Sequence, residues 1–207
     1  MSSSWIKLVL YGCGGHSRSV ADIALSNNPN IILEFIDPNA LENEKIFGFP
    51  VLKERSTVND PIFLAIGDNL KRKEMLQTLW PINLVSILSS IAYLGHGANL
   101  GNGCFIGNYC HIGPDVVIGK NTIINNAAII EHESRIGEHC HIGPNATISG
   151  RCHIGDLVFI GVGATIKDKI TICPNVKIGA GATVVHNIKE PGIYIGCPAK
   201  LMHSIKK

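Results

Sequence analysis

The clearest repeat in the chain spans residues 104–119 and reads CFIGNYCHIGPDVVIG. Within it an isoleucine recurs every six residues, and a glycine follows each one. The same period extends outward in both directions, so that an aliphatic residue occupies every sixth position from Leu94 to Val184 without a break. A period of six matches neither the 3.6-residue period of an α-helix nor the two-residue period of an isolated strand.

Such a period is typical of a parallel β-helix, in which each hexad forms a short strand and a corner. The aliphatic residue fills the interior, and a small or β-branched residue four positions later, such as Cys104 or Val116, tucks into the turn beneath it. Three hexads complete one triangular coil, so residues eighteen apart stack on each other at the strand spacing of ~4.8 Å. We therefore predict an all-β parallel β-helix of hexapeptide repeats within residues 89–207.

Three Cys-His pairs in the repeat, at Cys110-His111, Cys140-His141 and Cys152-His153, raise the question of zinc. Each cysteine takes an inward small position, and each histidine takes the outward position that follows it. The pairs fall on three different faces, so they do not converge on one ion within a chain. We predict core-packing cysteines and no metal site, which disfavours a γ-class carbonic anhydrase with its three zinc-binding histidines.

Residues 1–88 have a different pattern, which predicts a small α/β domain with a Rossmann-like parallel sheet. Buried strands are expected at 6–10, 31–36 and 62–66. One helix is expected from Arg18 to about Asn27, and a second one around residues 71–73. The carboxyl ends of the strands would share one sheet edge, where open α/β folds bind ligands.

The first strand ends in a glycine turn, GCGGHS at residues 12–17. The turn departs from the dinucleotide motif G-x-G-x-x-G, because Ser17 stands where the third glycine belongs. One interpretation is a tight strand-to-helix corner, and the other is a cradle of backbone N–H groups for phosphate. Fewer than about 90 residues precede the β-helix, too few for a complete NAD domain, so a half-size nucleotide or sugar-nucleotide pocket fits better.

The composition indicates which partners and which cellular compartment to expect. The 207 residues carry 18 Lys and Arg against 16 Asp and Glu, a net charge of +2, and no long basic run, so nucleic acid is not an expected partner. No apolar stretch approaches the ~20 residues of a membrane span, and the N-terminal apolar run is too short for a signal sequence. Seven cysteines, an odd number, favour free thiols in a cytoplasmic protein.

The repeat changes after Ile130, where Glu131, His132 and Glu133 follow instead of a glycine. A histidine beside carboxylates is a candidate general base, because a carboxylate partner fixes its tautomer and raises its basicity. The alternative is a solvated surface histidine. Stacking by eighteen places Gly150 over His132, where its backbone N–H is suited to stabilise a developing oxyanion.

Four segments together resemble the family of sialic-acid O-acetyltransferases and UDP-4-amino-sugar N-acetyltransferases. They are the turn at residues 12–16, the segment AIGDN at 65–69 with Arg72, the segment IEHE at 130–133, and the tail GIYIGCPAK at 192–200. The resemblance implies a Rossmann-like domain joined to a left-handed β-helix. It also implies a homotrimer that binds acetyl-CoA between neighbouring β-helices.

The resemblance also implies roles for individual residues. His132 matches the general base, Glu133 the residue that raises its basicity, and Gly150 the oxyanion donor. The positions that match the nucleotide-sugar site are Gly14, Gly15, His16, Asp37, Gly67, Asn69 and Arg72. The positions that match acetyl-CoA contacts are His141, Val162 and Ala180.

We expect an acetyl-CoA-dependent N-acetyltransferase that acts on a nucleotide-linked amino sugar, such as a UDP-4-amino-4,6-dideoxy sugar, in surface-glycan biosynthesis. Two alternatives stay open: a sialic-acid O-acetyltransferase, and a non-catalytic β-helix scaffold that only binds a nucleotide sugar. A pure scaffold would leave the change of repeat at His132 unexplained.

Overall fold

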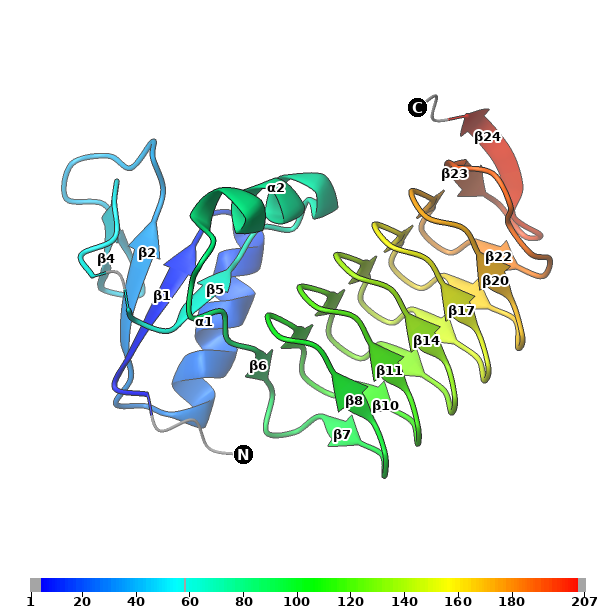
Figure 1. Ribbon diagram of the computed structural model, residues 1–207, viewed down its shortest axis with the longest axis horizontal. Helices are drawn as coiled ribbons and strands as arrows, with labels where there is room; N and C mark the ends of the chain where they lie inside the picture. Colours follow the sequence, from blue (N-terminus) through cyan, green and yellow to red (C-terminus); the bar gives the residue numbers. More distant parts are fainter. Residues whose placement is uncertain (1–4, 58, 205–207) are drawn as a thin grey trace.

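The computed structural model describes residues 5–57 and 59–204 and contains two parts (Figure 1). A small α/β domain at the N-terminus lies beside the first coils of a long parallel β-helix, along which the chain runs toward its C-terminus. The outer ends of the two predicted domains, residues 1–4 and 205–207, lie outside the described residues.

The predicted N-terminal parallel sheet is confirmed. Its central strands are β1 (Lys7–Tyr11), β2 (Ile32–Ile36) and β5 (Ile62–Leu64). The strand β1 lies between the other two and pairs with both in parallel. Leu8, Val9 and Leu10 are fully buried, as expected for a strand that is covered on both faces.

The first helix, α1 (Gly15–Asn27), begins three residues before the predicted start. The reason lies in Ser17, the residue that replaces the third glycine of the motif. Both its backbone N–H and its hydroxyl donate to the carbonyl of Gly14, which closes the first helical turn directly after the strand.

The sheet continues into an edge hairpin that the sequence pattern did not predict. Its strands are β3 (Lys45–Ile46) and β4 (Phe49–Leu52), which pair with each other in antiparallel and through β4 with β2. Phe47 and Gly48 form the two-residue turn with φ of 52° and 84°. Two positive φ values match a type I′ turn. Phenylalanine is an unusual residue at the first position of such a turn, so the sequence did not indicate the hairpin.

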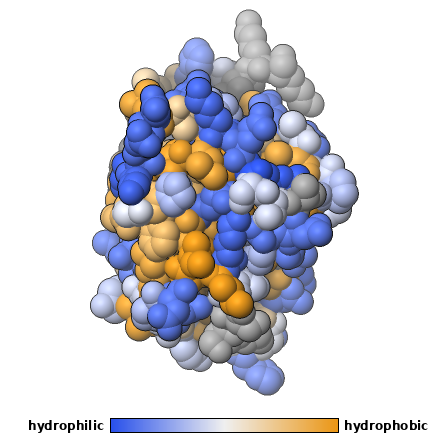
Figure 2. Space-filling model, turned by 90° about the vertical axis from the view of Figure 1, so that its left-hand side faces the viewer, coloured by the Kyte–Doolittle hydropathy of each residue, from blue (hydrophilic) through white to orange (hydrophobic). Residues whose placement is uncertain are grey.

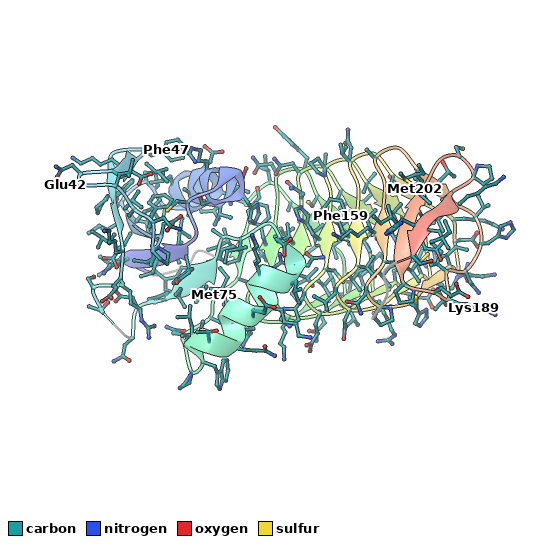
Figure 3. The ribbon with its side chains drawn as sticks, turned by 90° about the horizontal axis from the view of Figure 1, so that it is seen from above. Glu42, Phe47, Met75, Phe159, Lys189 and Met202 are labelled. Atoms are coloured by element: carbon teal, nitrogen blue, oxygen red, sulfur yellow. The ribbon has the colours of Figure 1, made fainter. Side chains whose placement is uncertain are left out.

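The second helix, α2 (Asn69–Leu79), contains the predicted residues 71–73. Asp68 caps it, because its carboxylate accepts a hydrogen bond of 2.9 Å from the backbone N–H of Lys71. The helix lies across the β-helix in the view from above (Figure 3), and its side chains reach the carbonyl oxygens of several coils.

The predicted β-helix is confirmed, and its short strands form three parallel sheets, which we call faces 1, 2 and 3 in the order in which the chain visits them. Face 1 consists of β6 (Ile87–Leu88), β9 (Phe105–Ile106), β12 (Ile123–Ile124), β15 (His141–Ile142), β18 (Phe159–Ile160), β21 (Lys177–Ile178), β23 (Gly192–Ile195) and β24 (Lys200–Ser204). The last strand, β24, runs antiparallel to β23 and ends the sheet.

The other two faces carry the remaining strands of the coils. Face 2 consists of β7 (Tyr93–Leu94), β10 (His111–Ile112), β13 (Ile129–Ile130), β16 (Thr147–Ile148), β19 (Thr165–Ile166) and β22 (Thr183–Val184). Face 3 consists of β8 (Asn99–Leu100), β11 (Val117–Ile118), β14 (Arg135–Ile136), β17 (His153–Ile154) and β20 (Thr171–Ile172). We name each edge of the prism by the two faces that it joins.

The eighteen-residue stacking is also confirmed, because Ile130 pairs with Ile112 below it and with Ile148 above it. All three side chains are fully buried in the core of the prism. The cysteines Cys110 and Cys140 occupy inward positions beside them and are buried as predicted.

The N-terminal domain docks on the outer side of face 1. Phe105 and Ile123 point outward from this face and are fully buried in the hydrophobic core of the N-terminal domain. Strand β6 joins face 1 directly after the domain, so the two parts share one packed junction. This junction places the carboxyl edge of the N-terminal sheet close to the β-helix.

The remaining surface of the N-terminal domain is mixed. Figure 2 shows the end of the molecule that this domain forms, with apolar atoms gathered among polar ones. Large apolar side chains exposed in the domain include Ile6, Ile32, Leu41 and Phe47. No helix within the described part of the chain is long and apolar enough to cross a membrane.

Candidate functional site

The first candidate centre lies on the 2–3 edge of the prism, at the corner between β13 and β14. Glu133 adopts a left-handed conformation there, with φ of 59°, as the residue in the same place does at most corners of the prism. The Nδ1 atom of His132 lies 3.0 Å from Oε2 of Glu133. Since this hydrogen bond needs a proton on Nδ1, Nε2 of the neutral ring is unprotonated. Both side chains are largely exposed, at 44% and 56%.

Gly150 lies directly beside this imidazole, one coil further on. A Cβ atom placed on Gly150 would come within 2.6 Å of Nε2 of His132, so only glycine leaves room for the ring in this position. The sequence prediction that eighteen residues bring Gly150 to His132 therefore agrees with the geometry. The absence of a side chain also allows the backbone of Gly150 to lie close to the imidazole.

The second candidate centre lies at the junction of the two domains, around His16 and His141. The ring of His16 makes an edge contact of 4.9 Å with Phe105 and lies 6.1 Å from the ring of His141. Nε2 of His16 is buried and has no hydrogen-bond partner within residues 5–57 and 59–204. Burial, aided by His141 and Arg72, lowers the pKa of His16 to about 3, so this histidine is neutral at physiological pH.

His141 is held on both ring nitrogens. Nδ1 lies 3.1 Å from the carbonyl oxygen of Gly67, to which it donates, and Nε2 accepts from Nδ2 of Asn125 at 3.3 Å. Burial lowers the pKa of His141 as well, against the opposing effect of the Gly67 carbonyl. The histidine predicted for acetyl-CoA thus faces the loop predicted for the nucleotide sugar. Its nearest ring neighbour on the β-helix is Phe159, at 5.3 Å.

The glycine turn is open to solvent at the carboxyl edge of the N-terminal sheet. Gly14 and Gly15 are exposed, and Cβ atoms placed on them would meet no other atom within 4 Å. The first turn of α1 carries no acidic residue, so its backbone N–H groups favour an anionic group. Asp37 follows β2 at the same edge and accepts a hydrogen bond from the backbone N–H of Asn39 at 2.9 Å.

A groove of about 620 Å³ runs between the start of α2 and face 1. The segment Gly67 to Lys71 forms one wall, and Phe159 and Lys177 belong to the opposite wall. In Figure 3, Phe159 lies part way along the β-helix. Sequence analysis missed Phe159, although an aromatic residue at an outward position of the repeat is a usable signal for a ligand surface.

Two residues predicted to bind substrate use their side chains for hydrogen bonds within the protein. Arg72 is completely buried, and its guanidinium N–H groups donate to oxygen atoms of the protein itself. Asn69 lines the groove, but its Nδ2 donates to the carbonyl oxygens of Leu157 and Val158. The prediction of substrate contact is therefore corrected for Arg72, because docking of α2 on the β-helix encloses its side chain.

The residues predicted to contact acetyl-CoA form two groups. Val162 and Ala180 are exposed neighbours on the 1–2 edge, where the backbone N–H of Gly181 donates to the carbonyl of Val162 at 2.9 Å. His141 instead lies on the outer side of face 1, inside the domain junction. Within one chain, the three positions do not form a continuous surface with His132, which lies on the 2–3 edge.

The histidines of the three Cys-His pairs lie on separate faces, as predicted. His111 belongs to β10, His141 to β15 and His153 to β17. Among residues 5–57 and 59–204, no group of three His, Cys, Asp or Glu side chains is placed to hold a metal ion. Burial raises the pKa of the Cys140 thiol to about 12, so it is a packing residue and not a nucleophile.

Comparisons with known proteins agree with this two-part architecture. Residues 7–79 match the family described as PglD N-terminal domain. Residues 97–132, 133–168 and 151–186 match the family described as bacterial transferase hexapeptide (six repeats). Together the matches cover well over half of the chain. Among curated proteins, none matches the chain significantly.

Several solved structures have the same fold over nearly the whole chain. The acetyltransferase domain of PglB from Neisseria gonorrhoeae is 27% identical with a TM-score of 0.89, and the match covers 95% of this chain and 100% of that one. The same domain in complex with acetyl coenzyme A is also similar, with 27% identity, a TM-score of 0.89 and coverage of 96% and 100%. A variant of perosamine N-acetyltransferase from Caulobacter crescentus, in complex with CoA and GDP-perosamine, is 28% identical with a TM-score of 0.85 and coverage of 96% and 97%.

Proposed function

We propose that this chain, a member of the bacterial hexapeptide transferases that carry a PglD N-terminal domain, uses acetyl-CoA to acetylate the amino group of a nucleotide-linked sugar. The observation that carries the proposal is the His132 imidazole, which is hydrogen-bonded to Glu133 through Nδ1 and holds Nε2 beside Gly150. The likeness to a perosamine N-acetyltransferase in complex with CoA and GDP-perosamine supports the choice of substrates.

The chemistry is direct transfer of the acetyl group. Nε2 of His132 takes a proton from the acceptor amine as the amine nitrogen attacks the thioester carbonyl carbon. The backbone N–H of Gly150 stabilises the oxyanion of the tetrahedral intermediate. The carbon–sulfur bond then breaks, and the imidazolium returns its proton to the departing CoA sulfur. Glu133 orients the ring and stabilises its protonated form.

The acceptor site of the proposal is the carboxyl edge of the N-terminal sheet together with the groove beside α2. The open turn at Gly14 and Gly15, at the start of α1, suits the diphosphate of a nucleotide sugar. Asp37 is placed to accept hydrogen bonds from hydroxyl groups at the same edge. The neutral His16 and the groove wall at Gly67 lie where the sugar would continue toward the β-helix.

The proposed reaction needs more than one copy of the chain. His132 lies on the 2–3 edge, which is the edge opposite face 1, whereas the acceptor groove lies on face 1. A base on one side of the prism cannot serve an acceptor on the other side. In the proposed homotrimer, His132 of one copy faces the acceptor groove of a neighbour, and acetyl-CoA lies along the 1–2 edge at Val162 and Ala180.

The test is an acceptor screen that measures CoA release from acetyl-CoA. The panel contains UDP-, GDP- and dTDP-linked 4-amino sugars, the same nucleotides with 4-hydroxyl sugars, and free sialic acid. We expect CoA release only with a nucleotide-linked amine, and an acetylated product of the matching mass. Release with sialic acid alone, or with the 4-hydroxyl sugars as fast as with the amines, would contradict the proposal.

A further inference from the structure

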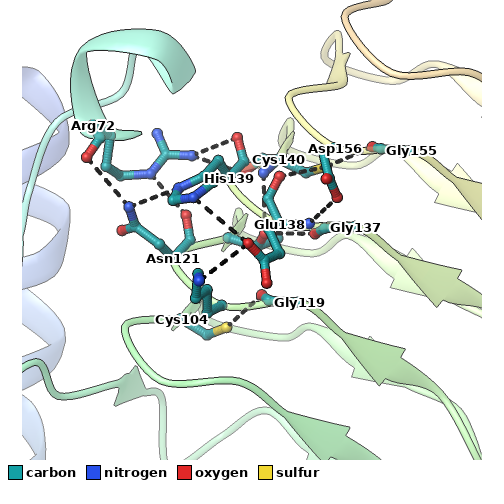
Figure 4. Close-up of polar contacts among 12 residues, drawn as sticks. Arg72, Cys104, Gly119, Asn121, Gly137, Glu138, His139, Cys140, Gly155 and Asp156 are labelled. Carbon is teal, nitrogen blue, oxygen red and sulfur yellow. Dashed lines mark hydrogen bonds and ion pairs between the residues drawn. The ribbon is translucent and has the colours of Figure 1, made fainter. Parts of the chain in front are cut away.

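The most completely enclosed charge of the described chain is the guanidinium of Arg72, on the first turn of α2. Figure 4 shows it between the helix and the β-helix, in contact with both. Burial lowers its pKa to about 10, so it stays charged at physiological pH. A buried cation is costly unless its hydrogen bonds are satisfied.

The partners of Arg72 come from both domains. On the N-terminal side, Nη1 donates to the carbonyls of Ile66 and Gly67 at 2.9 and 3.4 Å. On the β-helix side, Nε donates to the carbonyl of Asn121 at 2.9 Å, and Nη2 donates to the carbonyls of His139 and Cys140 at 3.1 and 2.9 Å. All of these acceptors are backbone oxygens, whose positions are set by the fold of each part.

Asn69 extends the same contact to a third coil. Its Oδ1 accepts from Nη2 of Arg72 at 2.9 Å, while its Nδ2 donates to the carbonyl of Leu157 at 3.3 Å. Asn121, His139 and Leu157 stand eighteen residues apart on the 3–1 edge and have φ values of 55°, 57° and 59°. The pair of Arg72 and Asn69 therefore binds a ladder of corner carbonyls on three successive coils.

His139 and Asn121 support the guanidinium from the other side. Nδ2 of Asn121 donates to the backbone oxygen of Arg72 at 3.3 Å and lies 3.0 Å from Nδ1 of His139, which accepts from it. Burial and the nearby guanidinium lower the pKa of His139 to about 4. A neutral ring at this position avoids a second positive charge beside Arg72.

We propose that Arg72 is a positioning residue for the acceptor groove. It holds the segment from Ile66 to Asn69, of which Gly67 to Asn69 belong to one wall of the groove, against the β-helix. Through Asn69 this contact extends to Leu157, which lines the groove on the β-helix side. The same segment supplies the Gly67 carbonyl that orients His141. The inference rests on the proposed function for the identity of the acceptor, but the geometry of the contact is independent of it.

The kinetic test compares Arg72→Met and Arg72→Lys with the matched control Lys73→Met, which removes a charge from the next residue of the same helix. We expect Arg72→Met to raise the acceptor KM by about tenfold or more and to change the acetyl-CoA KM less than about twofold. A merely structural role would lower the folded fraction, and with it kcat, without this split in KM.

The lysine variant separates charge from geometry. A single ammonium cannot span the carbonyls of both domains as the planar guanidinium does, so Arg72→Lys is expected to keep an acceptor KM at least about fivefold above wild type. An acceptor KM within about twofold of wild type in Arg72→Met, or full rescue by lysine, would overturn the proposal. Equal increases of both KM values would overturn it too.

Hydrogen exchange of the full-length protein tests the contact without any acceptor. In Arg72→Met the backbone amides of residues 71 and 72, which donate to Asp68 at the start of α2, are expected to exchange about tenfold faster or more, with residues 141–148 and the Lys73→Met control unchanged. Unchanged exchange at residues 71 and 72 would refute the positioning role. Lack of turnover by the wild type would refute only the proposed function. If Arg72→Met does not fold, Arg72→Lys and Asn69→Ala provide the same comparison, with smaller changes in the same direction.

Discussion

His132 on the 2–3 edge and the histidines at the domain junction show two uses of the same side chain. His132 stands at an exposed corner, where a carboxylate meets one nitrogen and the other is open. His16, His139 and His141 lie in the junction, where burial lowers their pKa values. The first setting can exchange protons during a reaction, whereas the second keeps neutral rings that pack and hydrogen-bond.

The largest expected effect is on the exposed side of this comparison. His132→Ala should lower kcat by about 10²–10⁴, the range for loss of general-base catalysis, while the outward-facing residue leaves the fold intact. The measurement is CoA release at saturating substrates, together with the Tm.

The control for that variant is His153→Ala, which removes an exposed histidine from the outer side of face 3. It should leave kcat within about twofold of wild type. Retention of more than about a third of wild-type turnover by His132→Ala would show that the base lies elsewhere.

A smaller effect is expected from Gly150→Ala, which changes the position of the base and not its chemistry. The new methyl group would lie 2.6 Å from Nε2 of His132, so the ring must move away. We expect kcat to fall by about 10- to 100-fold, because a displaced imidazole no longer has the geometry for proton transfer. The Tm should change little, because the ring is the far end of an exposed side chain.

A double-mutant cycle provides the control for Gly150→Ala. In the His132→Ala background there is no ring to displace, so adding Gly150→Ala should lower kcat by less than about threefold. Additive losses in the double variant would mean that Gly150 acts independently of the imidazole.

The next largest effect is expected from removing the imidazole of His16 at the domain junction. His16→Ala should raise the acceptor KM by about tenfold and leave the acetyl-CoA KM nearly unchanged, because His16 lies beside the groove segment at Gly67. Steady-state kinetics with each substrate varied in turn measures this split. The opposite split would move the acceptor pocket away from the N-terminal domain.

The positions of the histidines on the β-helix could be predicted from the sequence. A strict period of six places Gly150 beside His132 and separates His111, His141 and His153 onto three faces, because the repeat itself sets these distances. The turn at residues 12–17 and the parallel sheet follow from local patterns in the same way.

Local sequence patterns could not predict the burial of Arg72 or the orientation of His141, because both depend on how the N-terminal domain docks on face 1. Nothing in the local pattern of α2 states that its arginine will meet carbonyls of residues 121, 139 and 140. The edge hairpin was missed because its two-residue turn has Phe47 at a positive φ, where asparagine, aspartate or glycine would have been the recognisable signal.

The smallest expected effect concerns the stability of the junction at different pH. His16 and His139 have pKa values lowered by burial to about 3 and about 4, and that of His141 is lowered too. These rings are neutral in the folded protein but take up protons near pH 6.5 when the chain unfolds. The unfolded state therefore binds more protons below pH 6.5, so the free energy of unfolding should fall as the pH decreases from about 6.5 toward 4.

His16 and His139 should each contribute a loss of about 1 kcal/mol between pH 6.5 and pH 5.5. His139→Asn tests this contribution, because asparagine tolerates the φ of 57° and offers an oxygen in place of the Nδ1 that accepts from Asn121. Urea unfolding of this variant should show a loss smaller by about 1 kcal/mol over that interval than the wild type. His153→Asn, at an exposed position on face 3, is the matched control and should keep the wild-type dependence. If the free energy of unfolding of His139→Asn depends on pH as that of the wild type does, His139 takes up its proton in the folded state. His139 would then not differ from an exposed histidine in the way that we expect of the buried junction.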